Sequence, residues 1–314
     1  MRLEARIPIS PTSSFLNRTL LLAASLRRFY PDTIVRAYVG QAGGPTKEAS
    51  QRVEEAFSAH KIGWEWVGKT EFDRWGGTRS PYVATMNKRW AAPVDGDAVL
   101  IFDADVICAA RFDELLEVNA VQGVQAHVAP FNARDMDFLH TLAGMPEGVE
   151  QPYPYSGNGI MGPPDAHGPF YPNSGMVYLP KQWFEAMIPH YHDAVDVFAK
   201  TASDTYWTDQ IALMLAAAKA EVPVKALPPR YNFPNQHAFD QYYPGDLSDV
   251  RFIHYLRTDT VDREKEFADL SALRAFVRRT DLSGSNEVLR ETVAREMHVF
   301  LPPPLLSTED APYA

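Results

Sequence analysis

The sequence predicts an α/β protein with a central, mostly parallel sheet flanked by helices, followed by a small C-terminal helical extension. In the first half of the chain, short apolar runs alternate with helical patterns, as in strands joined by helical crossovers. The run Ala98–Phe102 is apolar at every position, which is typical of a central strand covered on both faces. The last patterned segments, at 271–279 and 285–298, are helical.

Capping residues and one-sided apolar patterns place the helices of the first half between short strands. Ser13 or Ser14 can cap a helix that ends before Pro31, and Pro45 opens a second helix. The expected order is a strand at 6–9, a helix at 13–30, a strand at 34–39, a helix at 45–60, a strand at 62–67, a helix at 82–90 and the strand Ala98–Phe102.

The second half continues with an apolar strand around 124–130 and then a segment at 147–172 that is rich in Pro, Gly and Tyr. Because this segment lacks both helical and strand periodicity, it predicts a long loop. The later elements are a strand at 175–179, helices at 181–200 and 207–219, strands at 222–227 and 251–255, and helices at 271–279 and 285–298. We therefore expect one domain over 1–258, a helical extension over 259–300 and, after three consecutive prolines, an extended or disordered tail over 301–314.

Composition excludes several classes of function. The 314 residues carry a formal charge of −10, which argues against a nucleic acid partner because such binding needs cations that neutralise phosphates. Cys108 is the single cysteine, so an internal disulfide and a zinc site of the type with two pairs of cysteines are excluded. No apolar leader follows the N-terminus and no apolar run approaches the ~20 residues of a membrane span, so we expect a cytoplasmic protein with no transmembrane segment.

The acidic pair Asp103 and Asp105 is the sharpest chemical feature, because it follows the buried strand directly. Ligands of open α/β sheets bind just outside the carboxyl ends of the strands. Two carboxylates one residue apart can both approach a hard divalent cation such as Mn²⁺ or Mg²⁺. The structural alternative is that the pair caps a helix that starts near Ala110.

Two enzyme classes place such a pair after an apolar strand. They are the metal-dependent glycosyltransferases of the GT-A fold and the phosphatases of the haloacid dehalogenase type, whose D-x-D-x-T/V motif is also satisfied by Asp103 to Val106. The phosphatase requires its first Asp near the start of its domain, a downstream lysine and a later acidic pair. Here about a hundred residues of α/β pattern precede the motif and no later acidic pair stands out, which favours the transferase.

Further motifs surround the acidic pair in a definite order. They are 21–26 with 30–33, Tyr82 and Lys88, Asn173 to Leu179 leading into Trp183, Thr208–Asp209–Gln210, and His254–Tyr255. In this order they resemble the nucleotide-sugar transferases of glycosyltransferase family 8, the lipooligosaccharide galactosyltransferase and glycogenin group, over residues 7–257. The resemblance implies a GT-A fold and the metal-dependent transfer of a sugar, with retention, from a nucleotide diphosphate donor, a UDP-sugar, to a carbohydrate or small-molecule acceptor.

The resemblance also implies roles for individual residues. Asp103, Asp105 and His254 hold the metal. Gln210 lies under the reacting sugar, whereas Asp209 would be the base of an inverting reaction. The donor contacts are Ile9, Ser10, Thr12, Lys88, Asp103, Ala104, Asn173, Gly175 and Arg257.

Several features depart from the family pattern or allow a plain structural explanation. Ile9 to Thr12 stand where the family has acidic residues that contact the base. The family's terminal motif H-x-x-G-x-x-K-P-W is reduced here to His254–Arg257 and lacks both its glycine and its lysine. Arg257 or another cation would therefore have to contact the diphosphate of the donor. Lys88, Arg89 or Arg79 can add positive charge, although a solvated helix face is the alternative for each. A sugar-nucleotide-binding module without catalysis is the remaining alternative function.

Overall fold

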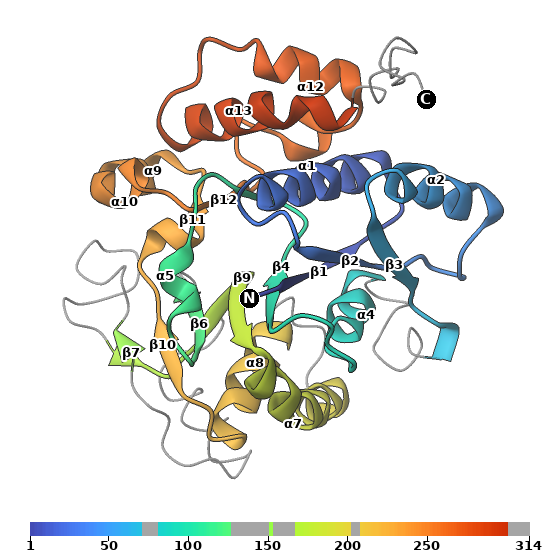
Figure 1. Ribbon diagram of the computed structural model, residues 1–314, viewed down its shortest axis with the longest axis vertical. Helices are drawn as coiled ribbons and strands as arrows, with labels where there is room; N and C mark the ends of the chain where they lie inside the picture. The colour runs from blue at the N-terminus through green and yellow to red at the C-terminus, as the bar shows by residue number, and fades with distance from the viewer. Residues whose placement is uncertain (71–80, 127–150, 153–166, 202–207, 301–314) are drawn as a thin grey trace, which may run out of the picture.

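The structure is a computed structural model that describes residues 1–70, 81–126, 151–152, 167–201 and 208–300. A central sheet with helices on both faces organises these residues (Figure 1). The strand order is β10-β6-β9-β4-β1-β2-β3. The strands are β1 (Leu3–Ile9), β2 (Ile34–Val39), β3 (Ile62–Trp66), β4 (Ala98–Phe102), β6 (Val121–Gln125), β9 (Pro172–Pro180) and β10 (Val224–Ala226).

Parallel pairing dominates this sheet. Neighbouring strands run parallel except at β9, which is antiparallel to both β4 and β6. The mostly parallel sheet predicted from the sequence is therefore confirmed. Near the strand predicted around 124–130, β6 occupies Val121–Gln125, and residues 127–130 lie outside the described part of the chain. The strand predicted at 175–179 begins at Pro172, because β9 lies between β4 and β6 and pairs with both.

The alternating residues of β4 lie in two separate cores. Leu100 and Phe102 pack with helices α1 (Ser13–Phe29) and α2 (Lys47–Ser58) on one face. Val99 and Ile101 pack with α4 (Pro81–Lys88), α7 (Lys181–Thr201) and α8 (Thr208–Lys219) on the other. This strand is thus covered on both faces, as its wholly apolar sequence predicts.

The N-cap of the first helix lies one residue before the earlier of the two predicted caps, Ser13 and Ser14. Thr12 is the N-cap of α1, and its hydroxyl accepts a hydrogen bond from the backbone N–H of Phe15. Ser14, which the sequence also allowed as the cap, is buried and donates its hydroxyl to the carbonyl of Arg263.

A small second sheet brings the late part of the chain to the acidic pair. It has the order β11-β12-β5, with β11 (Phe233–Pro234), β12 (Phe252–His254) and β5 (Val106–Cys108). β12 runs antiparallel to β5, so that His254 pairs with Val106 and the N–H of Tyr255 donates to the carbonyl of Asp105 at 2.8 Å. This sheet therefore places His254 beside the residues that follow β4.

The alternative in which the acidic pair caps a helix near Ala110 is wrong. β5 directly follows the pair, and the next helix, α5 (Asp113–Leu116), has Phe112 at its N-cap. Neither aspartate is thus a helix cap.

The C-terminal helices α11 (Arg263–Glu266), α12 (Leu270–Val277) and α13 (Gly284–Glu296) lie over α1 (Figure 1). Phe267, Phe276 and Leu289 share one apolar core with Leu16 and Leu20 of α1. The boundary at residue 258 stays a prediction, and the tail over 301–314 lies outside the described residues.

Shorter elements complete the described chain. They are β7 (Gln151–Pro152), β8 (His167–Gly168), the 3-10 turns η1 (Pro229–Tyr231) and η2 (Met297–Phe300), α9 (His237–Tyr242) and α10 (Pro244–Ser248). Most of the predicted loop at 147–172 lies outside the described residues, as does Arg79. None of the described helices combines the length and the apolar character that a membrane span needs.

Candidate active site

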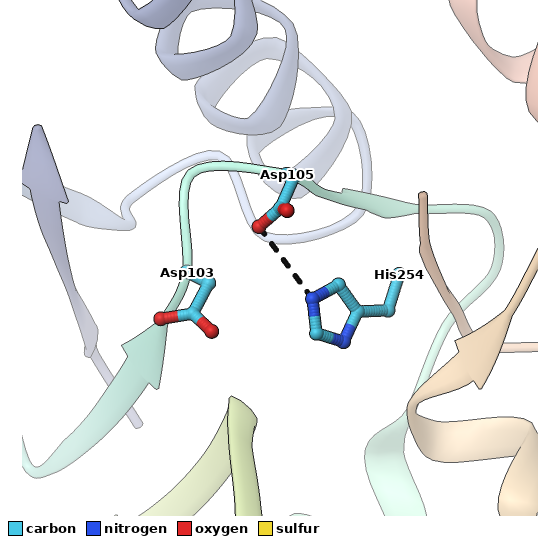
Figure 2. A group of neighbouring side chains, drawn as sticks. All are labelled: Asp103, Asp105 and His254. Atoms are coloured by element: carbon cyan, nitrogen blue, oxygen red, sulfur yellow. Dashed lines mark ion pairs between the residues drawn. The ribbon is translucent and has the colours of Figure 1, made fainter. Parts of the chain in front are cut away.

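Two carboxylates and one imidazole meet at the carboxyl end of β4. Asp103 and Asp105 come from the turn between β4 and β5, and His254 comes from the end of β12 (Figure 2). One ligand atom from each residue lies within 4.8 Å of the others. The Nε2 atom of His254 is 3.5 Å from Oδ1 of Asp105. The three residues that the sequence predicts as metal ligands thus lie together in the folded chain.

This donor set fits a divalent cation. His254 is buried, and burial lowers the pKa of its imidazole, which the Asp103 carboxylate offsets only in part. A neutral imidazole offers a lone pair to a metal. Carboxylate oxygens suit hard cations, and three protein ligands leave coordination positions for substrate oxygens.

Gly175 in β9 allows His254 to reach this position. A Cβ atom on Gly175 would lie 2.5 Å from Nδ1 of His254 and 2.7 Å from Oδ1 of Asn232. Real Cβ contacts are not that short, so a side chain here would push the imidazole away. The glycine that the family resemblance singles out therefore has a steric reason in this structure.

We expect Gly175→Ala to weaken Mn²⁺ binding by about 10- to 100-fold, the cost typical of disturbing the support of a metal ligand. The added methyl group displaces His254 from Asp105. Titration calorimetry with Mn²⁺ measures the effect. Gly245→Ala in α10 is the matched control, because no atom lies within 4 Å of the position of its new methyl group. Unchanged Mn²⁺ affinity in Gly175→Ala would contradict the assignment.

A buried arginine connects the acidic pair to the start of α8. The Arg89 guanidinium is 3.6 Å from Oδ1 of Asp103 and 3.3 Å from Oδ2 of Asp209, and it donates to the carbonyl of Phe102 at 2.8 Å. Its side chain is 1% exposed. The neighbouring Lys88, which was predicted as a donor contact, forms an ion pair with Glu65 at 3.0 Å. Arg89, directly after the end of α4, thus reaches the acidic site.

Asp209 is a buried carboxyl group with an unusual pKa. Burial raises the pKa of Asp209 to about 6, because the Arg89 guanidinium offsets the cost of desolvation only in part and the negative charge of Asp103 adds to it. At neutral pH the Asp209 carboxyl group is mostly ionised, although its buried surroundings disfavour the charged form.

We expect Asp209→Asn to stabilise the metal-free protein increasingly as the pH rises from about 4 to 7. The folded-state pKa of Asp209, about 6, lies above the ordinary value of 3.8, so the stability that protonated Asp209 contributes is present at low pH and is lost as the pH rises through 6. Asparagine does not titrate. The difference in unfolding free energy between variant and wild type should therefore grow by about 2 kcal/mol over this range.

Urea unfolding in the presence of a chelator measures this difference. Asp193→Asn is the control, because it makes the same chemical change at a carboxylate that is 69% exposed on α7. A pH-independent difference for Asp209→Asn would refute the raised pKa.

Several buried polar atoms beside these residues have no hydrogen-bond partner among the described residues. They are Oδ1 of Asp209, Oε1 of Gln210 and Oδ1 of Asn232. The amide of Asn232 donates to Asn173 at 2.8 Å, and Asn173 also accepts from the N–H of Gly175 at 2.9 Å. No family motif assigns Asn232 a place in the site, and its proximity to Gly175 is what marks it in the structure. Buried acceptors of this kind can accept hydrogen bonds from hydroxyl or amide groups of a ligand.

The remaining predicted donor contacts lie in varied surroundings. The side chain of Ile9 is buried in the core and its carbonyl accepts from Gly40, whereas Ser10 is half-buried and Thr12 caps α1. Ala104 is buried, and its carbonyl accepts from the hydroxyl of Tyr255 at 3.4 Å. Their contacts with a donor stay predictions.

The predicted cation Arg257 does not touch the acidic cluster in this structure. Its side chain is 70% exposed and lies 3.7 Å from Asp262. Instead Arg263, at the start of α11, forms an ion pair with Oδ2 of Asp105. Arg263 lies nine positions beyond His254 and matches no motif, so only the packing of α11 reveals it.

Comparison with solved structures relates this fold to glycosyltransferases. The galactosyltransferase LgtC, crystallised with donor and acceptor sugar analogs, is 15% identical, and the match covers 96% of this chain and 98% of LgtC with a TM-score of 0.51. A structure of an active-site mutant of LgtC matches with a TM-score of 0.51 at 14% identity, covering 93% and 95% of the two chains. No protein-family model and no curated protein matches the sequence. The family 8 resemblance is thus confirmed at the level of the fold: this chain has the GT-A fold.

Proposed function

We propose that this protein is a metal-dependent glycosyltransferase that moves a sugar from a UDP-sugar to a carbohydrate or small-molecule acceptor with retention of configuration. The observation that carries the proposal is the cluster of Asp103, Asp105 and His254 at the carboxyl end of the central strand β4. Ligand sites of open α/β sheets lie at this edge.

The three clustered side chains would hold a Mn²⁺ or Mg²⁺ ion. When bound, such an ion neutralises the negative charge that develops on the departing diphosphate. Asp103 and Asp105 supply the anionic ligands, and the buried, neutral His254 supplies the third without adding a charge. Burial of the cluster strengthens each of these charge interactions.

The donor sugar would be oriented by the buried acceptors beside this cluster. Hydroxyl groups of a sugar can donate to Oδ1 of Asp209, to Oε1 of Gln210 and to Oδ1 of Asn232, which have no partner among the described residues. Arg89 holds the other oxygen of Asp209, so this carboxylate is positioned to accept a hydrogen bond. Such a set selects a polyhydroxylated ligand.

Retention is supported by the chemistry of the residue next to Asp209. Gln210 is buried at the start of α8, and an amide is not a base at neutral pH. Asp209 is engaged by Arg89, which disfavours it as the base that an inverting reaction requires. The LgtC mutant replaces an active-site glutamine by glutamate, so a glutamine lies in the active site of that enzyme.

The phosphatase alternative finds no support in this arrangement. An aspartyl phosphatase uses its first aspartate as a nucleophile, with a lysine nearby. Among the described residues, Arg89, Asp105 and His254 lie beside Asp103. The cation of this group is a buried guanidinium that also pairs with Asp209.

The direct test is a donor panel. The protein is incubated with UDP-, GDP- and ADP-linked sugars and Mn²⁺, and the released nucleoside diphosphate and inorganic phosphate are measured separately. We expect slow hydrolysis of a UDP-sugar that stops when a chelator is added. Release of phosphate from a phosphomonoester panel would instead indicate a phosphatase, and UDP binding unaffected by the chelator and without turnover would indicate a binding module.

A further inference from the structure

Arg263 of the C-terminal extension reaches the metal cluster at Asp105, whereas Arg89 reaches it at Asp103. Its guanidinium contacts Oδ2 of Asp105, while Oδ1 of the same carboxylate faces Nε2 of His254 at 3.5 Å. Both partners are mostly shielded, with 25% of the Arg263 side chain and 10% of the Asp105 side chain exposed. Asp105, a predicted metal ligand, is therefore already paired with a cation of the protein.

The charges of the cluster leave little attraction for a bare dication. Asp103, Asp105 and Asp209 contribute three negative charges, and Arg89 and Arg263 contribute two positive charges, for a net charge of −1. A dication that binds to Asp105 meets repulsion from the guanidinium on the same carboxylate. A diphosphate, which carries several negative charges, removes this imbalance by giving Arg263 another anionic partner.

The backbone of Arg263 is fixed while its side chain is long enough to change partners. Its carbonyl accepts the hydroxyl of Ser14, and the carboxylate of Asp262 accepts the N–H of Glu264 at 3.1 Å. Glu264 in turn pairs with the buried Arg18 of α1 at 3.3 Å. α11 is thus anchored to α1, and rotation about side-chain bonds suffices to move the guanidinium away from Asp105.

We propose that Arg263 makes metal binding depend on the donor: it holds Asp105 when no ligand is bound and exchanges this carboxylate for the donor diphosphate when metal and nucleotide bind together. This inference rests on the proposed function, since it concerns the same metal and the same class of donor. It assigns to the C-terminal extension a direct part in donor binding, through a residue outside the motif in which Arg257 stands.

The experiment measures binding by calorimetry with the full-length protein and without turnover. Mn²⁺ is titrated into wild type, Arg263→Gln and Arg263→Lys, first alone and then with saturating UDP. We expect Arg263→Gln to bind Mn²⁺ alone about tenfold more tightly than wild type, the size of one charge-assisted hydrogen bond. In Arg263→Gln, the factor by which UDP increases the affinity for Mn²⁺ should be at least about tenfold smaller than in wild type. By reciprocity, the factor by which Mn²⁺ increases the affinity for UDP should fall equally.

Two further variants separate charge from structure. Arg263→Lys keeps the charge and should remain within about threefold of wild type in Mn²⁺ affinity, since the repulsion persists. Arg274→Gln removes an exposed cation of α12 and should change neither affinity. Unfolding temperatures of all variants are compared to identify any loss of structure.

The outcomes distinguish this inference from the function on which it rests. Equal Mn²⁺ affinity and equal coupling to UDP in wild type and Arg263→Gln would overturn the role of Arg263 and leave the metal-dependent transferase in place. The same holds if Arg263→Gln binds Mn²⁺ more weakly. Absence of Mn²⁺ binding in every variant, with and without UDP, would overturn both proposals.

Discussion

Asparagine at position 105 is expected to lower metal-dependent UDP-sugar hydrolysis by at least about a thousandfold, the scale on which loss of transition-state charge stabilisation acts. Asp105 offers one of the three ligand atoms that lie within 4.8 Å of one another. An amide of nearly the same shape removes the negative charge while preserving the packing. Because the cluster carries a net charge of −1 before the ion enters, loss of one carboxylate leaves no attraction for a dication.

The measurement is kcat/KM for nucleoside diphosphate release with saturating Mn²⁺. Asp193→Asn makes the same chemical change on the exposed face of α7 and should keep the wild-type rate. Circular dichroism and the unfolding temperature establish that Asp105→Asn is folded. Hydrolysis that survives in Asp105→Asn and also resists a chelator would exclude a metal held by this cluster.

Methionine in place of Arg89 is expected to destabilise the protein by about 3–5 kcal/mol, the usual cost of removing one partner of a buried ion pair. The Arg89 side chain is 1% exposed and lies between Asp103 and Asp209, so its removal leaves two carboxylates close together without their shared cation. The carbonyl of Phe102, at the end of β4, also loses its donor. Urea unfolding at pH 7.5 measures the change.

The neighbouring lysine and a double variant make this prediction specific. Lys88 pairs with Glu65, whose side chain is 57% exposed, so Lys88→Met should cost less than Arg89→Met. Adding Asp209→Asn to Arg89→Met removes one of the two unpaired carboxylates and should restore part of the lost stability, as a double-mutant cycle reports for residues in contact. Equal losses in Arg89→Met and Lys88→Met, or no recovery in the double variant, would mean that Arg89 does not hold the two carboxylates.

Much of the fold could be predicted because its signals are local. The apolar run Ala98–Phe102 indicated a strand covered on both faces, and β4 has one core on each side. The strands Ile34–Val39 and Ala98–Phe102 were predicted with their observed bounds. In contrast, β5 and β11 have three and two residues, too short for a periodic pattern to reveal.

The candidate site likewise combines residues that the sequence predicts with residues that only the fold reveals. Asp103 and Asp105 are separated by a single residue and come directly after a strand. Their chemistry and their place at the sheet edge can therefore be predicted from the sequence. The sequence names Lys88, Arg89 and Arg79 together as possible cations, because only packing decides that the Arg89 guanidinium lies 3.6 Å from Asp103. Asn232 and Arg263 carry no motif and enter the site through elements that fold from distant parts of the chain.

The sequence by itself determined the alternation of strands and helices, the acidic turn after a buried strand and the order of the motifs, because each depends on neighbours within about ten positions and on the geometry of helix and strand. Tertiary structure alone decided that β12 pairs with β5, which brings His254 to Asp105, and that α11 packs on α1, which brings Arg263 there. These contacts join residues far apart in the chain. They form because burying apolar surface and pairing backbone groups favour one global arrangement, and no local pattern specifies which distant side chains that arrangement unites.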